Sequence, residues 1–192
     1  YQDQALARRF RDFVAKMPEA LQAPVADSYY KLLAYKDEYE VARLHLASAD
    51  QARAEFEGDF RMTFHLAPPI LGGKGPDGHP KKRAFGPWIV PVFRLLARMK
   101  GLRGTAFDPF GRSSERRTER ALIAQYEADM AEVAPLWSPA TADAIRALAE
   151  LPMLIRGFGH IKEAAVAAAA RRREDLLARI RAGGAPLRQA AE

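Results

Sequence analysis

The amino-acid sequence predicts a mainly α-helical fold, a multi-helix domain with one small β-hairpin or strand pair. Three observations support this. Apolar residues recur at steps of three and four along most of the chain, which is the period of a helix with a buried face. One short stretch, 60–66, instead alternates apolar and polar residues, as a half-buried strand does. Glycine and proline gather just after that stretch, where they indicate a loop.

The N-terminal stretch 2–16 is expected to form the first helix. Leu6, Phe10 and Phe13 follow one another at steps of four and three, so one face of this helix is expected to be buried. Pro18 ends the pattern, because the residue before a proline disfavours helical backbone angles.

The stretch 25–48 is expected to form one continuous helix at the centre of the fold, because it carries apolar residues on two opposite sides. Asp37 lies in the middle of one of these apolar faces. An unpaired carboxylate in a protein interior is too costly to be retained. We therefore expect Asp37 to be a buried structural group paired with an arginine. The candidate partners are Arg156, Arg61 and Arg43.

The alternating stretch 60–66 is expected to be a strand, and 81–85 is a candidate for its partner in a hairpin. Between them, the segment 67–87 is rich in glycine and proline, and loops of such length tend to be functional or mobile. We expect the loop 70–84 to be mobile in the isolated chain and to become ordered against other parts of a larger enzyme.

The rest of the chain is expected to be helical. The predicted segments are 88–99, 114–135, a helix that begins at Ser138-Pro139 and is interrupted at Pro152, and 160–181. Since no linker separates these segments, we expect a single helical domain over 1–182. The remaining residues, 183–192, have little to bury and are expected to be a frayed tail.

Composition narrows the classes of function. The 192 residues include no cysteine, so the chain cannot by itself build a disulfide, a thiolate zinc site or an iron–sulfur cluster. The four histidines show no spacing with acids that predicts a metal site. No apolar stretch is long enough to cross a bilayer, and the missing cysteines fit a reducing cytoplasm. Because the chain begins with Tyr1 rather than methionine, we interpret it as a fragment or a processed product.

Charge is segregated along the chain, whose formal net charge is +6. The segment 78–107 contains no acid. Its bases are Lys81, Lys82, Arg83, Arg94, Arg98, Lys100 and Arg103. Such a segment attracts phosphates, nucleic acid or an acidic protein surface.

Four stretches, taken together and in this order, resemble the C-terminal region of bacterial indolepyruvate ferredoxin oxidoreductases, which belong to the 2-oxoacid:acceptor oxidoreductase group. The resemblance spans roughly 1–181. The stretches are Tyr30 to Leu44; Phe56 to Phe60 continuing through Phe64-His65-Leu66-Ala67-Pro68-Pro69; Phe85-Gly86-Pro87-Trp88 followed by Arg103-Gly104-Thr105 and Asp108-Pro109-Phe110-Gly111; and Ile155 to Lys162.

This resemblance implies membership of an enzyme that oxidatively decarboxylates arylpyruvates to aryl-acetyl-coenzyme A and passes the electrons to ferredoxin. Thiamine diphosphate and iron–sulfur clusters serve that chemistry, and the family places the thiamine machinery before this region. The chain has neither cluster cysteines nor a recognisable thiamine-phosphate motif. The resemblance therefore implies no cofactor and no catalytic residue in this chain, whose partners would be the other domains or subunits of the oxidoreductase.

Two clusters are candidate sites for an anion or for the phosphates of coenzyme A. In the first, Arg156, His160 and Lys162 surround the glycines that precede the last helix, where backbone N–H groups and the helix dipole favour an anion. The alternative is a tight loop in which Arg156 pairs with an acid. In the second, Lys81, Lys82 and Arg83 form a basic run, whose alternative interpretation is a solvated loop or a patch facing an acidic neighbour.

Two functions follow. The first is a non-catalytic accessory domain of a large oxidoreductase, which forms structure or interfaces. The second is a free-standing basic helical module that binds nucleic acid or another polyanion. Aromatic residues do not interleave with the bases as a platform for stacking nucleobases needs, so the sequence favours the accessory domain.

Overall fold

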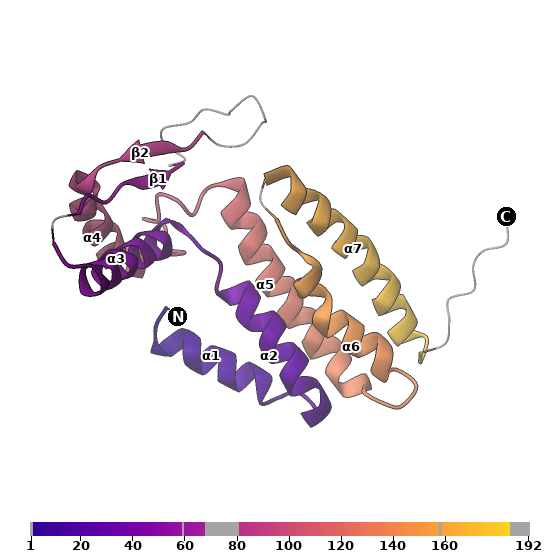
Figure 1. Cartoon of the computed structure of the whole chain (residues 1–192). Helices are drawn as coiled ribbons and strands as arrows, with labels where there is room; N and C mark the ends of the chain where they lie inside the picture. The colour runs from indigo at the N-terminus through magenta and orange to yellow at the C-terminus, as the bar shows by residue number, and fades with distance from the viewer. Residues whose placement is uncertain (1, 59, 68–80, 158, 185–192) are drawn as a thin grey trace. The chain divides into compact units, whose positions relative to one another are not determined.

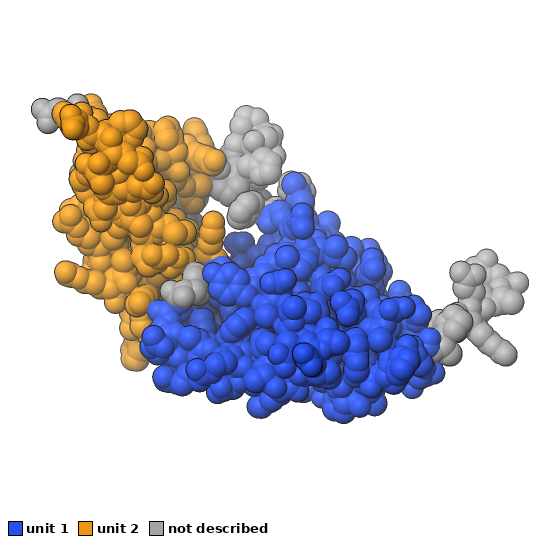
Figure 2. Space-filling model, turned by 60° about the horizontal axis from the view of Figure 1, so that its bottom comes forward, with its two compact units in different colours: residues 1–35, 114–192 blue, residues 36–113 orange. Residues whose placement is uncertain are grey.

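The computed structural model describes residues 2–58, 60–67, 81–157 and 159–184 (Figure 1). Within these residues the fold has seven α-helices and one two-stranded sheet, which confirms the predicted fold class. The chain divides into two compact units, residues 1–35 with 114–192 and residues 36–113 (Figure 2). The range for which we predicted a single domain contains parts of both units. Most of the predicted tail, 185–192, lies outside the described residues.

The first unit is a helical bundle. In it, α2 packs against α1, α5 and α6, and α6 also packs against α7 (Figure 1). Among the described residues, its elements are α1 (Gln4–Val14), α2 (Glu19–Leu33), α5 (Ser114–Val133), the 3-10 turn η4 (Ala134–Leu136), α6 (Ala142–Glu150), the 3-10 turn η5 (Leu151–Leu154) and α7 (Gly159–Arg181).

The core of this bundle is built around α2. Leu21, Val25 and Tyr29 recur every four residues along one side of α2 and are fully buried, as the helical period requires. The ring of Tyr29 stacks on that of Tyr126 from α5, with the centroids 6.2 Å apart. The Tyr126 hydroxyl donates to the Ala149 carbonyl at 2.9 Å, so burial leaves this polar group satisfied.

The helix that we expected to begin at Ser138-Pro139 begins instead at Ala142. Residues 138–141 form a turn, in which the Ser138 N–H donates to Thr141 Oγ1 at 3.0 Å and the Thr141 hydroxyl donates to the Leu136 carbonyl at 2.6 Å. Because the threonine side chain bonds the preceding backbone, it closes a turn there before the helix starts.

The second unit pairs two helices with a short hairpin. Its described elements are α3 (Glu38–Glu55), β1 (Phe64–Leu66), β2 (Arg83–Phe85), the 3-10 turn η2 (Pro87–Ile89), α4 (Val90–Arg98) and the 3-10 turn η3 (Met99–Leu102). The strands are antiparallel, with Phe64 opposite Phe85 and Leu66 opposite Arg83. The predicted hairpin is therefore confirmed, although each strand has three residues.

The core of this second unit lies between α3 and α4. Ala42 and Ala49 of α3 are buried in one cluster with Ile89 and Phe93, and small residues on α3 let the two helices approach closely. His45 of α3 also enters this core. Its ring stacks on that of Phe93, with a centroid distance of 5.1 Å.

The single helix that we expected over 25–48 is wrong, because two helices, α2 and α3, occupy that range. The Ala34 N–H donates to the Tyr30 carbonyl and closes the last turn of α2. Asp37 then has an extended backbone and accepts a hydrogen bond from the Glu40 N–H at 2.9 Å, so it is the N-cap of α3. The break falls where the chain passes from one compact unit to the other.

Candidate functional site

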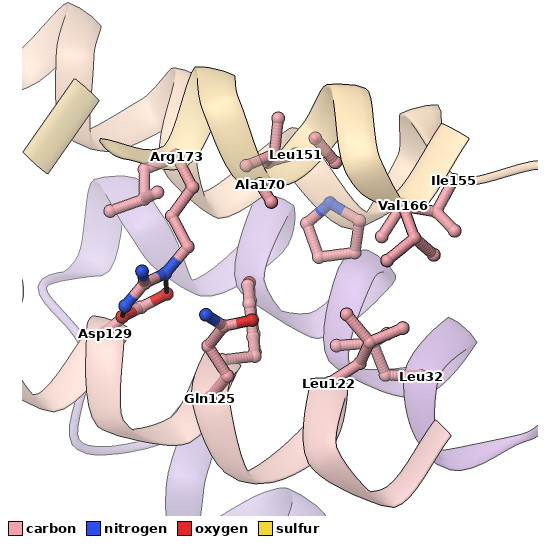
Figure 3. Close-up of a pocket in the computed structure, with 13 residues that line it drawn as sticks. Leu32, Leu122, Gln125, Asp129, Leu151, Ile155, Val166, Ala170 and Arg173 are labelled. Atoms are coloured by element: carbon pink, nitrogen blue, oxygen red, sulfur yellow. Dashed lines mark hydrogen bonds and ion pairs between the residues drawn. The ribbon is translucent and has the colours of Figure 1, made fainter. Parts of the chain in front are cut away.

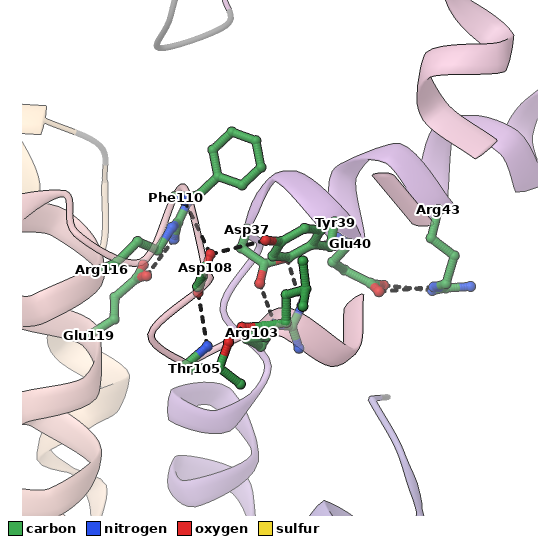
Figure 4. Close-up of polar contacts among 12 residues, drawn as sticks. Asp37, Tyr39, Glu40, Arg43, Arg103, Thr105, Asp108, Phe110, Arg116 and Glu119 are labelled. Atoms are coloured by element: carbon green, nitrogen blue, oxygen red, sulfur yellow. Dashed lines mark hydrogen bonds and ion pairs between the residues drawn. The ribbon is translucent and has the colours of Figure 1, made fainter. Parts of the chain in front are cut away.

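Asp37 combines two structural tasks in the second unit. Besides capping α3, its carboxylate accepts two hydrogen bonds from the Arg103 guanidinium, one of them from Nη2 at 2.6 Å (Figure 4). The side chains of Asp37 and Arg103 are only 3% and 7% exposed. A buried charge pair of this kind holds its geometry because planar guanidinium and carboxylate groups match each other.

Asp37 is thus buried and paired, but its partner is Arg103 rather than one of the three arginines that we expected. Arg43 forms a two-point ion pair with Glu40, whose Oε1 lies 2.6 Å from Arg43 Nη2. The Arg156 Nε donates to the Met153 carbonyl in the first unit. The expectation failed because it placed Asp37 inside a helix, whereas the N-cap position turns its side chain toward the segment after α4.

A second carboxylate, Asp108, organises the same segment (Figure 4). It is 5% exposed and accepts hydrogen bonds from the Tyr39 hydroxyl at 3.0 Å, the Gly104 N–H at 2.8 Å and the Phe110 N–H at 3.1 Å. Gly104 has a φ of +73°, a backbone region that favours glycine. Asp108 therefore fixes the turn 104–110 onto α3.

The protonation states in this cluster are set by burial and hydrogen bonding. Burial alone would raise the pKa of Asp108, but the hydrogen bonds from Gly104 and Tyr39 outweigh it and hold that pKa below its ordinary value. Burial and the neighbouring Asp108 carboxylate raise the pKa of Tyr39. At neutral pH the pair is therefore a neutral phenol donating to a carboxylate.

The cationic cluster predicted at the start of α7 lies in the first unit, where its groups bond to the fold. Lys162 Nζ lies 2.7 Å from Oε1 of Glu119, a residue that is 8% exposed. Nearby, Lys31 Nζ donates to the carbonyls of Pro152 and Ile155 at 2.8 and 2.9 Å. Burial, followed by the charges of Arg156 and Lys162, lowers the pKa of Lys31.

The position of Gly157, shortly before α7, requires glycine. Gly157 has a φ of +98°, and a Cβ atom on it would lie 2.6 Å from Cγ2 of Ile161. Arg156 and Lys162 both act electrostatically on Lys31, which places these predicted residues in one region. The side chain of His160 lies outside the described part of the structure.

The other predicted cluster belongs to the second unit. Lys81, Lys82 and Arg83 are exposed, and Arg83 begins β2. Residues 70–80 of the loop that we expected to be mobile lie outside the described residues. The two candidate anion clusters thus belong to different compact units.

A partly open pocket of about 60 Å³ lies in the first unit (Figure 3). Its lining is mainly apolar and comes from α2, α5, α6, η5 and α7. At one edge, Arg173 donates to Asp129 at 2.6 and 2.5 Å. Because an engineered cavity of about 150 Å³ just accommodates benzene, this one has room for a small apolar group and is too small for a coenzyme.

Sequence reasoning missed Arg103 and Asp108 as partners of the 37–40 segment. The available signal was that both residues belong to the motif stretches that carry the family resemblance. Among the described residues, no group of three or more histidine or acidic side chains could hold a metal ion. No described helix combines the length and apolar character needed to span a membrane.

Comparison with known proteins identifies the family of the chain but no activity. No curated protein and no solved structure matches the chain. Residues 1–175 match DUF6537, a family of unknown function. Since the match covers most of the 192 residues, the chain belongs to the DUF6537 family.

Proposed function

We propose that this chain is a non-catalytic accessory domain of an indolepyruvate ferredoxin oxidoreductase. Its partners would be the domains that hold thiamine diphosphate and the iron–sulfur clusters, with ferredoxin as the electron acceptor of the whole enzyme. One observation carries the proposal. The motif residues that resemble this family form hydrogen bonds and ion pairs within the fold.

Those motif residues bond to one another. Asp37 and Tyr39, from the first motif stretch, bond to Arg103 and Asp108 of the third. Lys31, also from the first, donates to the Ile155 carbonyl at the start of the fourth. In a catalytic domain, motif side chains would be expected to converge on an open cleft with polar groups held ready for substrate.

The buried charges support the same function. Asp37, Glu119 and Asp129 are each less than one-tenth exposed, and each is bonded to a cation of the same compact unit. Each carboxylate therefore compensates a neighbouring cation, and its removal leaves that charge unpaired. A structural role therefore explains why these three carboxylates are buried.

The test compares cofactor binding with assembly. Calorimetry of the 192-residue chain with thiamine diphosphate and magnesium is expected to show no binding heat. A shortened oxidoreductase is prepared that lacks the segment corresponding to this chain. The chain, supplied separately, is expected to bind the shortened enzyme and to restore its oxidation of indolepyruvate with coenzyme A and ferredoxin. A micromolar dissociation constant for thiamine diphosphate, or no restoration and no binding to the shortened enzyme, would contradict the proposal.

One observation favours the alternative of polyanion binding: the cations of 81–100 are exposed. If the chain binds nucleic acid through them, fluorescence anisotropy with a short duplex should give an affinity that falls steeply with salt, at a logarithmic slope of about −0.9 per phosphate contacted. Replacing Lys81, Lys82 and Arg83 by alanine should then reduce that slope. Under the accessory-domain proposal we expect no such binding at physiological salt.

A further inference from the structure

The surface of α4 carries an apolar stripe that the described fold leaves uncovered. Trp88 at the start of this segment is 66% exposed, and Val92 and Leu95 are 44% and 60% exposed. Val92 and Leu95 are three residues apart on one side of α4, and Trp88 belongs to the turn η2 that leads into this helix. On another side of the same helix, Ile89 and Phe93 are buried against α3. The helix is therefore apolar on two sides, and only one of them is used by the core.

The sequence segment that carries this stripe has charges of a single sign. The acid-free segment 78–107 contains seven bases, of which Arg103 is buried against Asp37. The other six are exposed. By contrast, α3 carries both signs and pairs them on its own surface, as in Arg43–Glu40 and Arg53–Asp50. Arg94 and Arg98 are the exposed charges of α4 itself, and exposed apolar side chains on a cationic helix complement a surface with an apolar centre and an acidic rim.

Two other occupants fit these features less well. Nucleic acid would match the cations and could stack a base on Trp88, but Val92 and Leu95 add only aliphatic surface, on which bases do not stack. A second copy of the chain would have to supply the acids. In α5, the most acidic helix, Glu127, Asp129 and Glu132 already form ion pairs. Their partners are Arg9, Arg173 and Arg181, respectively.

We propose that the stripe formed by Trp88, Val92 and Leu95, together with the exposed cations of α4, is the surface through which this chain docks onto an acidic, apolar-centred face of another polypeptide region. This inference rests on the proposed function, because it takes that region to be part of the oxidoreductase. Beyond the proposed function, the inference names the helix that makes the contact and the chemistry of the surface that it contacts.

The test uses a variant that keeps the fold and removes the stripe. Val92→Ser/Leu95→Ser changes only exposed side chains, and Leu154→Ser/Ile161→Ser is the matched control, since these residues of the first unit are 55% and 52% exposed. Circular dichroism melting should show that both variants remain folded. Binding of each to the shortened oxidoreductase is then measured by calorimetry.

We expect the stripe variant to bind about tenfold or more weakly than the unaltered chain, because central apolar contacts dominate interface energies. The control should bind normally. Arg94→Glu/Arg98→Glu should also weaken binding, and its effect should shrink as salt is raised.

Equal binding of the unaltered chain and the stripe variant would overturn the docking surface and leave the proposed function intact. Absence of binding by the unaltered chain would overturn both. Two further results would overturn the choice of partner. One is a dimer in sedimentation velocity that the stripe variant abolishes, which would make the partner a second copy. The other is stripe-dependent binding to phosphatidylserine vesicles, which would make it a membrane.

Discussion

The strongest single determinant of the second unit is expected to be Asp37. Replacing it by alanine removes two interactions, the N-cap of α3 and the ion pair with Arg103. Replacing it by asparagine keeps an oxygen that can accept from the Glu40 N–H but removes the charge. The two variants therefore separate the contribution of the cap from that of the ion pair.

The size of the effect follows from burial. Because the Arg103 side chain is 7% exposed, losing its partner leaves a buried charge, at a cost of about 3–5 kcal/mol. Loss of the cap adds about 1 kcal/mol. Asp37→Asn should therefore cost about 3–5 kcal/mol, and Asp37→Ala about 1 kcal/mol more. Since whole domains are stable by only about 5–15 kcal/mol, either change should be visible in an unfolding curve.

The assay is urea unfolding followed by circular dichroism, combined with hydrogen exchange of the α3 amides. Asp50→Ala is the control, because its ion pair with Arg53 is exposed and should contribute less than about 1 kcal/mol. Adding Arg103→Met to Asp37→Ala removes the stranded charge and should recover about 2–3 kcal/mol. A cost of Asp37→Asn no larger than that of Asp50→Ala would refute the reasoning, since the pair would then be solvated.

Two further predictions concern the core of the second unit and the residues that follow α7 in the first. Burial lowers the pKa of His45 below its ordinary value of 6.5. As pH drops from 6.5 toward the folded pKa, the unfolded chain takes up the proton first, so the free energy of unfolding should fall. His45→Phe should abolish this fall in urea unfolding measured across that range, and an unchanged pH profile would contradict the prediction. Gly183 and Gly184 both have positive φ, but a Cβ atom on Gly184 would lie 1.9 Å from the Ala140 carbonyl oxygen whereas Gly183 has open space. Gly183→Ala should cost about 1–2 kcal/mol and Gly184→Ala about 1–3 kcal/mol more, and equal melting temperatures for the two variants would show that the Ala140 contact is absent.

The local features of the fold could be predicted from the sequence because they depend on periodicity. The spacing of Phe10 and Phe13 indicated the first helix, and the alternation in 60–66 indicated the hairpin. The break between α2 and α3 could not be predicted in this way, because residues 34–37 contain neither glycine nor proline. Without such a residue, an aspartate fits the interior of a helix as well as an N-cap, and only its three-dimensional surroundings decide between the two positions.

The pairing of the candidate site residues was harder to predict for a related reason. Arg103 lies 66 residues from Asp37, and Lys162 lies 43 residues from Glu119. No local pattern fixes which of the chain's many arginines and lysines reaches a given acid. The burial of Asp37 could be inferred from its apolar neighbours, whereas its partner depends on how the segment after α4 returns to α3.

The structure separates two kinds of residue that the sequence presents together. Arg103 and Lys81 belong to one acid-free segment, yet Arg103 is buried against Asp37 while Lys81 is exposed. Changes at buried motif residues should therefore lower stability first, and every activity of a larger enzyme would fall with it. Changes on the exposed side of α4 should leave stability intact and affect only association. Measuring unfolding and assembly on the same variants thus distinguishes a domain that merely folds from one that also docks, which is the distinction on which the proposed function depends.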